Sequence, residues 1–221
     1  MGIGHAAVAL GASRVAPRVN VGILVFAAFL ADFLLGIFGA FGMEQAHVPP
    51  DYATRHYLTF TFPYSHGLVA LIVWGVLFGA IFSWVDRQDR MRAFWVMAAL
   101  VFSHFLLDGL VHVPELPLMG QNSPKVGLAL WNHMRLELTL ETLMALVGLV
   151  IYWMLNGGTK LSRTGMAAFV VLLTALTWTQ LFSTTAPTQA QLVPTWMFAP
   201  IVFSAIPYLL DRKRIALVKK S

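Results

Sequence analysis

Long apolar runs separated by short polar segments dominate the chain. A helix needs about 20 mainly apolar residues to cross the hydrocarbon core of a bilayer. Six runs reach this length, at about residues 20–42, 62–85, 93–113, 134–155, 165–184 and 191–210. The pattern predicts an all-α protein, a polytopic integral membrane helical bundle in which residues 1–221 form a single domain.

The two ends of the pattern are irregular. Residues 1–12 are apolar but would extend only about 18 Å as a helix, so they could form a half-helix that dips into the membrane. The last run contains Pro194, Pro200 and Pro207. Proline removes a backbone donor and its ring clashes with the preceding turn, which predicts a kinked or broken helix there.

Composition agrees with a membrane protein. Hydrophobic residues make up 58% of the chain and charged residues only 11%, whereas soluble domains carry about 25% charged residues. This excludes a water-soluble enzyme and a nucleic-acid-binding domain. The chain has no cysteine, so any metal ion must be held by histidines and carboxylates.

The basic residues gather on one side of the predicted membrane. Twelve of the fifteen Lys and Arg residues lie there: Arg14, Arg18, Arg87, Arg90, Arg92, Lys160, Arg163, Arg212, Lys213, Arg214, Lys219 and Lys220. An excess of positive charge marks the cytoplasmic side, which predicts that both termini are cytoplasmic. We interpret these residues as solvated orientation signals that face anionic lipid, which explains the net charge of +5 without a nucleic-acid partner.

Seven ionisable side chains fall inside or at the ends of the predicted spans, all in the half opposite the basic residues. They are Asp32, His66, His104, Asp108, His112, Glu137 and Glu141. Such groups cost free energy in a bilayer unless they are paired or functional. None is a Lys or Arg, so the set needs protons or a divalent cation to balance its charge.

The third span carries the clearest motif. His104, Asp108 and His112 are spaced four residues apart, which places them on one face of a helix. Together with Asp32 and His66 at the same depth, they predict a metal site, most simply for zinc. A structural hydrogen bond between His104 and Asp108 is the alternative, and His112 could instead lie at the membrane interface.

Glu137 and Glu141 share one face of the following span. We expect a general acid or base, a further metal ligand, or a residue that supports a ligand. For Glu137 the alternatives are an ion pair with Arg135 or a hydrogen bond to a neighbouring helix. Glu141 is deeper and has no nearby cation, so it is the better candidate for a catalytic proton carrier.

His5 depends on the position of the N-terminal segment. If residues 1–12 enter the membrane as a half-helix, His5 reaches the middle of the bilayer and can meet Asp32. If they lie flat on the surface, His5 takes no part in the site. The sequence leaves both arrangements open.

These residues resemble the YdjM-like inner-membrane proteins, a family of membrane-bound metal-dependent hydrolases. The similarity covers about residues 1–120, although a second Asp after Asp32 and a His-Arg pair before Ser65 are absent. The matching stretches are Gly4-His5-Ala6-Ala7, Asp32, Tyr64-Ser65-His66-Gly67 and Ser103-His104 through Asp108. The resemblance implies a metal-dependent hydrolase of the bacterial inner membrane.

The leading hypothesis is therefore a membrane-embedded hydrolase in which Asp32, His66, His104 and Asp108 hold a zinc-like ion. Its substrate would be a lipid, a lipid-linked compound or a small molecule from outside. Three alternatives stay open: a proton- or metal-coupled transporter or channel, a haem or quinone protein with His66 and His104 as axial ligands, and a structural subunit. The oligomeric state is not predicted.

Overall fold

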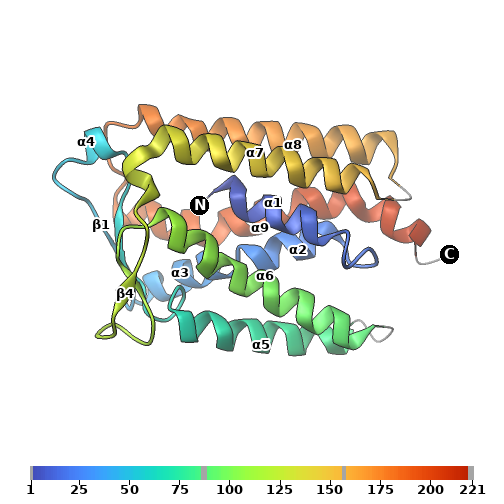
Figure 1. Ribbon diagram of the computed structural model, residues 1–221, viewed down its shortest axis with the longest axis horizontal. Coiled ribbons are helices and arrows are strands. Elements are labelled where there is room, and N and C mark those ends of the chain that lie inside the picture. Colours follow the sequence, from blue (N-terminus) through green and yellow to red (C-terminus); the bar gives the residue numbers. More distant parts are fainter. Residues whose placement is uncertain (1, 86–88, 156–157, 219–221) are drawn as a thin grey trace.

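A computed structural model describes residues 2–85, 89–155 and 158–218 as a helical bundle with a small cap of strands at one end (Figure 1). Arg87, Lys219 and Lys220, from the predicted basic side, lie outside these residues. The helices are α1 (Ile3–Ala12), α2 (Val21–Ala28), α3 (Leu30–Ala40), α4 (Tyr52–Arg55), α5 (Leu68–Val85), α6 (Arg90–Val111), α7 (Met134–Trp153), α8 (Lys160–Trp178) and α9 (Gln189–Val218).

Four helices of the described chain are long and apolar enough to cross a membrane. They are α6, α7 with its preceding turn, α8 with its following turn, and α9. The α2–α3 pair would make a fifth span, although its two helices are bent by 52° at Phe29. The predicted helical bundle is thus present, whereas the described residues contain four helices long enough to span, or five spans with the bent pair, instead of the six predicted.

Two predicted spans differ in form from the structure. The run 62–85 becomes helical only at Leu68, because the backbone N–H groups of Tyr64 and Ser65 donate to the carboxylate of Glu44 instead of entering a helix. The proline-rich run is not broken, since α9 continues through all three prolines as one helix. Neighbouring helices and hydroxyl side chains can satisfy the carbonyl groups that proline leaves without a partner.

The strands were not predicted from the sequence. β1 (Gln45–His47) pairs antiparallel with β2 (Thr59–Thr61), so that Ala46 lies opposite Phe60. β3 (Leu116–Pro117) pairs antiparallel with β4 (Lys125–Val126). Together with α4 and two 3-10 turns, Leu130–His133 and Thr179–Phe182, they cap one end of the bundle (Figure 1).

The short helix α1 lies inside the bundle, where it packs against α2, α6, α7 and α8. Its side chains are mostly buried, among them Ile3, Ala6 and Leu10. At the crossing with α7, a Cβ atom on Gly148 would lie 2.5 Å from the carbonyl oxygen of Ala7. Only a glycine permits this close approach, which fixes the position of α1.

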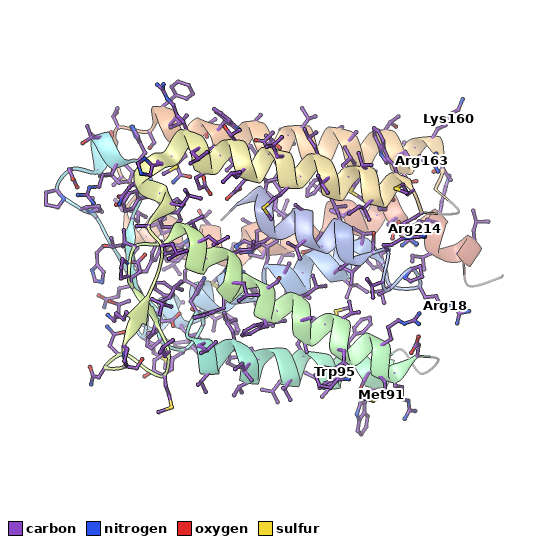
Figure 2. The ribbon with its side chains drawn as sticks, in the orientation of Figure 1. Arg18, Met91, Trp95, Lys160, Arg163 and Arg214 are labelled. Atoms are coloured by element: carbon purple, nitrogen blue, oxygen red, sulfur yellow. The ribbon has the colours of Figure 1, made fainter. Side chains whose placement is uncertain are left out.

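The basic side chains gather at the end of the bundle opposite the strands. Figure 2 places Arg18, Lys160, Arg163 and Arg214 there. Arg214, however, is not a solvated orientation signal as predicted, since it is only 1% exposed. Its guanidinium donates to Asp211 from Nε at 2.6 Å and from Nη2 at 2.8 Å, and also to the carbonyl oxygens of Pro17 and Val19. The reason is that the turn before α2 folds over the last turns of α9.

Candidate metal centre

Four segments of the chain bring the predicted ligands together. His104 and Asp108 lie on α6, His5 on α1 and Asp32 in the first turn of α3. His66 lies just before α5, and His112 caps the end of α6. Asp108 is about 27 Å along the helix axis from Arg90 at the basic end, so the cluster lies in the opposite half of the bundle.

Asp108 lies at the centre of the cluster, surrounded by four imidazole nitrogens. Its Oδ2 atom is 3.2 Å from His104 Nε2, 3.6 Å from His66 Nε2 and 3.5 Å from His112 Nε2. Its Oδ1 atom is 3.2 Å from His5 Nε2. Asp108 and all four histidines are almost completely buried, so bulk water does not compensate for their polarity.

The contact between His66 and His104 defines the chemistry of the cluster, because the two Nε2 atoms are 3.1 Å apart. Nδ1 of His104 lies 2.8 Å from the carbonyl oxygen of Ala28. A carbonyl only accepts, so this Nδ1 carries a proton, and the ring presents a lone pair at Nε2 when it is neutral. His66 has the same orientation, since its Nδ1 lies 2.7 Å from a Ser65 hydroxyl whose hydrogen is donated to Glu44.

A bend in the first predicted span supplies one of these partners. The chain turns by 52° between α2 and α3, next to the Ala28 carbonyl that accepts from His104. The same bend places Asp32 in the first turn of α3, where its carboxylate lies 3.8 Å from His66 Nε2 and 3.9 Å from His104 Nε2. Non-helical backbone within a bundle is typical of places where it serves a site.

Two carboxylates outside the cluster hold its histidines, and neither was predicted. Glu44 is fully buried and accepts from Ser65 Oγ at 2.6 Å, which in turn contacts His66. Burial raises the pKa of the Glu44 carboxyl, against the effect of its hydrogen bonds from Ser65 and Tyr64. Glu115 lies 2.5 Å from His112 Nδ1 and also accepts from the backbone of Phe60. Histidine ligands of metal ions characteristically donate their second nitrogen in this way.

His5 joins the cluster, which resolves the two arrangements left open by the sequence. Its ring stacks on that of His104, with centroids 3.8 Å apart and an angle of 2° between the planes. Among the described residues, neither ring nitrogen of His5 has a hydrogen-bond partner with suitable geometry. Glu141 holds the segment from α7: its two carboxylate oxygens accept from the backbone N–H groups of Gly2 at 2.9 Å and Gly4 at 3.3 Å.

Glu137 lies one turn before Glu141 and is 2% exposed. Within the described part of the chain, its Oε1 atom has no hydrogen-bond partner, and no ion pair joins it to Arg135. Burying an unpaired carboxylate oxygen costs free energy, so such a group is characteristic of a functional site. The predicted catalytic roles of Glu137 and Glu141 remain predictions.

A cavity of about 800 Å³ reaches the cluster from the strand end of the bundle. Asp32, His66, Asp108, His112, Glu137 and Glu141 all line it. The Asp32 side chain is 27% exposed, so the cavity gives access to a cluster that is otherwise buried. Its volume is in the range of sites for small organic ligands.

The donor atoms suit a small divalent ion. Two groups of three ligand atoms lie close enough to hold one, namely His5 with His104 and Asp108, and Asp32 with His66 and His104. Ligand atoms of a tetrahedral zinc ion lie about 3.3 Å apart, and the atoms of each group lie within 4.8 Å of one another. His104 belongs to both groups.

Spacing within α6 and depth along the spans could predict the clustered residues. The carboxylates that hold their histidines, Glu44 and Glu115, lie outside the predicted spans. Glu115 follows His112 by three residues, a local signal that could have been noticed. Glu44 is 21 residues from Ser65 and gives no such signal. No family model, curated protein or solved structure matches the chain, so the case for function depends on this geometry.

Proposed function

We propose that the protein is a membrane-embedded, metal-dependent hydrolase whose divalent ion, most simply zinc, is held by Asp32, His66, His104 and Asp108. One observation carries the proposal: two buried imidazoles present Nε2 atoms to one another at 3.1 Å while their Nδ1 atoms are engaged as donors. Two lone pairs at this distance repel unless a proton or a metal ion lies between them. Histidine and carboxylate donors together are typical zinc ligands.

The cavity supports catalysis over a purely structural role for the ion. A bound divalent ion supplies Lewis acidity, which polarises a carbonyl group and makes water more acidic. Hydrolysis breaks the acyl C–O or C–N bond and forms a C–OH bond from water. Asp32, the partly exposed carboxylate of the cluster, would accept the proton of this water, and Glu137 would deliver a proton to the leaving oxygen or nitrogen.

Glu141 fits a positioning role. Both of its oxygens hold the N-terminal turn of α1, and α1 carries His5 into the cluster. A carboxylate at the N-terminus of a helix is stabilised by the free N–H groups and the helix dipole. We therefore assign proton transfer to Glu137 and the placement of His5 to Glu141.

The apolar helices and the basic end support a location in a membrane with both termini cytoplasmic. On this orientation the cluster lies in the outer half of the bilayer and its cavity reaches the outer surface. The resemblance to YdjM-like proteins, carried by His5, Asp32, His66, His104 and Asp108, favours the bacterial inner membrane and a metal-dependent hydrolase.

A direct test uses the purified full-length protein in detergent, loaded with zinc, and a panel of p-nitrophenyl esters and anilides. We expect hydrolysis that falls at least about a hundredfold in His104→Ala and in Asp108→Asn, as for removal of a catalytic metal centre. Asp89→Asn, which removes a carboxylate at the basic end of the bundle, is the matched control and should keep full activity. Equal activity in His104→Ala and wild type would refute the proposal.

A further inference from the structure

Charged groups are segregated around the cavity. The carboxylates of Asp32, Asp108, Glu137 and Glu141 line it, and its described lining contains no Lys or Arg. Two basic side chains lie on the other side of a partition. Arg55 and Arg135 line a neighbouring cavity that shares Tyr57 and Trp131 with this one.

The partition between the two cavities is an aromatic stack. The rings of Tyr57 and Trp131 are 5.5 Å apart and inclined by 29°. The pair packs against Met134 and Leu138 of α7, which lie three residues before and one residue after Glu137 in sequence. Arg55 donates to the Tyr57 hydroxyl at 2.8 Å and is paired with Asp51, which keeps its charge engaged on the far side.

The wall contributed by α8 and its continuation is polar but uncharged. Thr177, Thr179, Gln180 and Ser183 line the cavity on this side, with Gln191 at the start of α9. Hydroxyl and amide groups of this kind hydrogen-bond neutral polar groups of a ligand. Enzymes that transfer phosphoryl groups instead surround the phosphate with Arg, Lys or additional metal ions.

We propose that the substrate of this site is an uncharged carboxylic ester or amide, and that anionic substrates such as phosphoesters and acyl compounds with a free carboxylate are excluded by the charge of the cavity. The inference depends on the proposed hydrolase function and names its substrate class. Asp32 and Asp108 would be offset by the divalent ion and Glu137 would carry its proton, so Glu141 would supply the remaining negative charge. Within the described lining no basic side chain would offset its repulsion of an anion. The aromatic stack and the neutral wall would accommodate the remaining parts of such a substrate.

The test uses the full-length protein loaded with Co²⁺, whose visible absorption changes when a ligand reaches the ion. Three probes share one metal-binding group and differ only in charge: butyrohydroxamic acid is neutral, succinic monohydroxamic acid carries a carboxylate, and β-alanine hydroxamic acid carries an ammonium group. We expect the anionic probe to bind at least about tenfold more weakly than the neutral one, because a repulsion of modest size between buried charges has this effect.

A charge variant sharpens the test. Thr179 is an exposed residue that lines the cavity, and its hydroxyl bonds only its own turn. Thr179→Lys should bring the affinity of the anionic probe close to that of the neutral probe. Thr164→Lys is the matched control, since Thr164 is exposed on the same helix near the basic end and is bonded in the same way.

The outcomes separate the two proposals. A protein that binds no cobalt refutes the metal-dependent hydrolase, and the substrate class falls with it. A cobalt-loaded protein that binds the anionic probe as tightly as the neutral one, or binds neither probe, overturns only the substrate class. A preference for the neutral probe that persists in Thr179→Lys also overturns it, because the cause would then be something other than the charge of the cavity.

Discussion

Two buried carboxylates at opposite ends of the bundle have opposite environments. Asp211 is 0% exposed and accepts from Val21 N, Tyr152 OH and the guanidinium of Arg214, so donors surround it. Asp108 is 2% exposed and lies among four imidazole nitrogens, at least one of which presents a lone pair. The first cluster is neutral without any added ion. In the proposed metal centre, a divalent ion would balance the carboxylates of the second.

Burial of a carboxylate alone therefore does not identify a functional site. Arg214 and Asp211 join the turn before α2 to the end of α9, and a hydrogen-bonded ion pair is sufficient to do this. The cluster around Asp108 joins α1, α3 and α6 and is reached by a cavity. The access to solvent and the absence of a Lys or Arg among the contacts described above distinguish the candidate metal centre from the ion pair.

The largest effect on stability is expected from breaking the ion pair between Asp211 and Arg214. Arg214→Met should lower the free energy of unfolding by about 3–5 kcal/mol, because it leaves the buried charge of Asp211 without its main partner. The measurement is equilibrium unfolding in mixed detergent micelles. The double variant Asp211→Asn/Arg214→Met should recover most of the loss, and zinc per folded chain should be unchanged in both. Loss of zinc in the folded variants would show that the two clusters are coupled.

Zinc should stabilise the protein only through the cluster around Asp108. At a free zinc concentration of about 100 times Kd, linkage predicts a gain of about 2.7 kcal/mol for the wild type. The same gain is expected in the Asp211→Asn/Arg214→Met variant and none in Asp108→Asn. Unfolding in the presence and absence of zinc measures it. An equal gain in Asp108→Asn would place the bound zinc elsewhere.

A smaller effect is expected from the groups that support the histidines. Glu44→Gln weakens the chain from Glu44 through Ser65 to His66, and such changes typically reduce metal affinity by about 10–100-fold. Competition with a coloured chelator gives the affinity, and Glu44→Asp should restore part of it. Nitrogen-15 chemical shifts of His66 should also reveal a changed tautomer. Unaltered shifts and affinity would mean that Glu44 serves only to fold its loop.

The smallest effect on stability is expected from removing the carboxylate of Asp108 when no metal is bound. In metal-free protein, Asp108→Asn should change the free energy of unfolding by less than about 1 kcal/mol, because uncharged imidazoles stabilise a carboxylate less than the guanidinium of Arg214 stabilises Asp211. The corresponding removal of Asp211 alone should cost several times more. Comparable losses for Asp108→Asn and Asp211→Asn would contradict the distinction.

The sequence predicts the metal cluster better than its surroundings, for physical reasons. His104 and Asp108 share a helix face through their spacing, and Asp32 and His66 follow from their depth in predicted spans. Glu44, the Ala28 carbonyl and the ion pair of Arg214 arise from contacts between distant segments. Local periodicity contains no information about such contacts.

The fold shows the same limit. The apolar runs predict the long helices. Residues 62–67 nevertheless lie outside the helix that follows them, because the backbone N–H groups of Tyr64 and Ser65 donate to Glu44, which is distant in sequence. Conversely, the prolines of α9 indicate a break that the surrounding bundle prevents. The buried position of α1 depends on Gly148, whose role becomes apparent only once the two helices are seen to cross.

The most direct test of the central claim is elemental analysis of the purified full-length protein. We predict one divalent ion per chain in the wild type, one in the Asp211→Asn/Arg214→Met variant, and none in His104→Ala or Asp108→Asn. Wild-type protein without a stoichiometric metal after zinc loading, or an unchanged metal content in the His104→Ala and Asp108→Asn variants, would contradict the account.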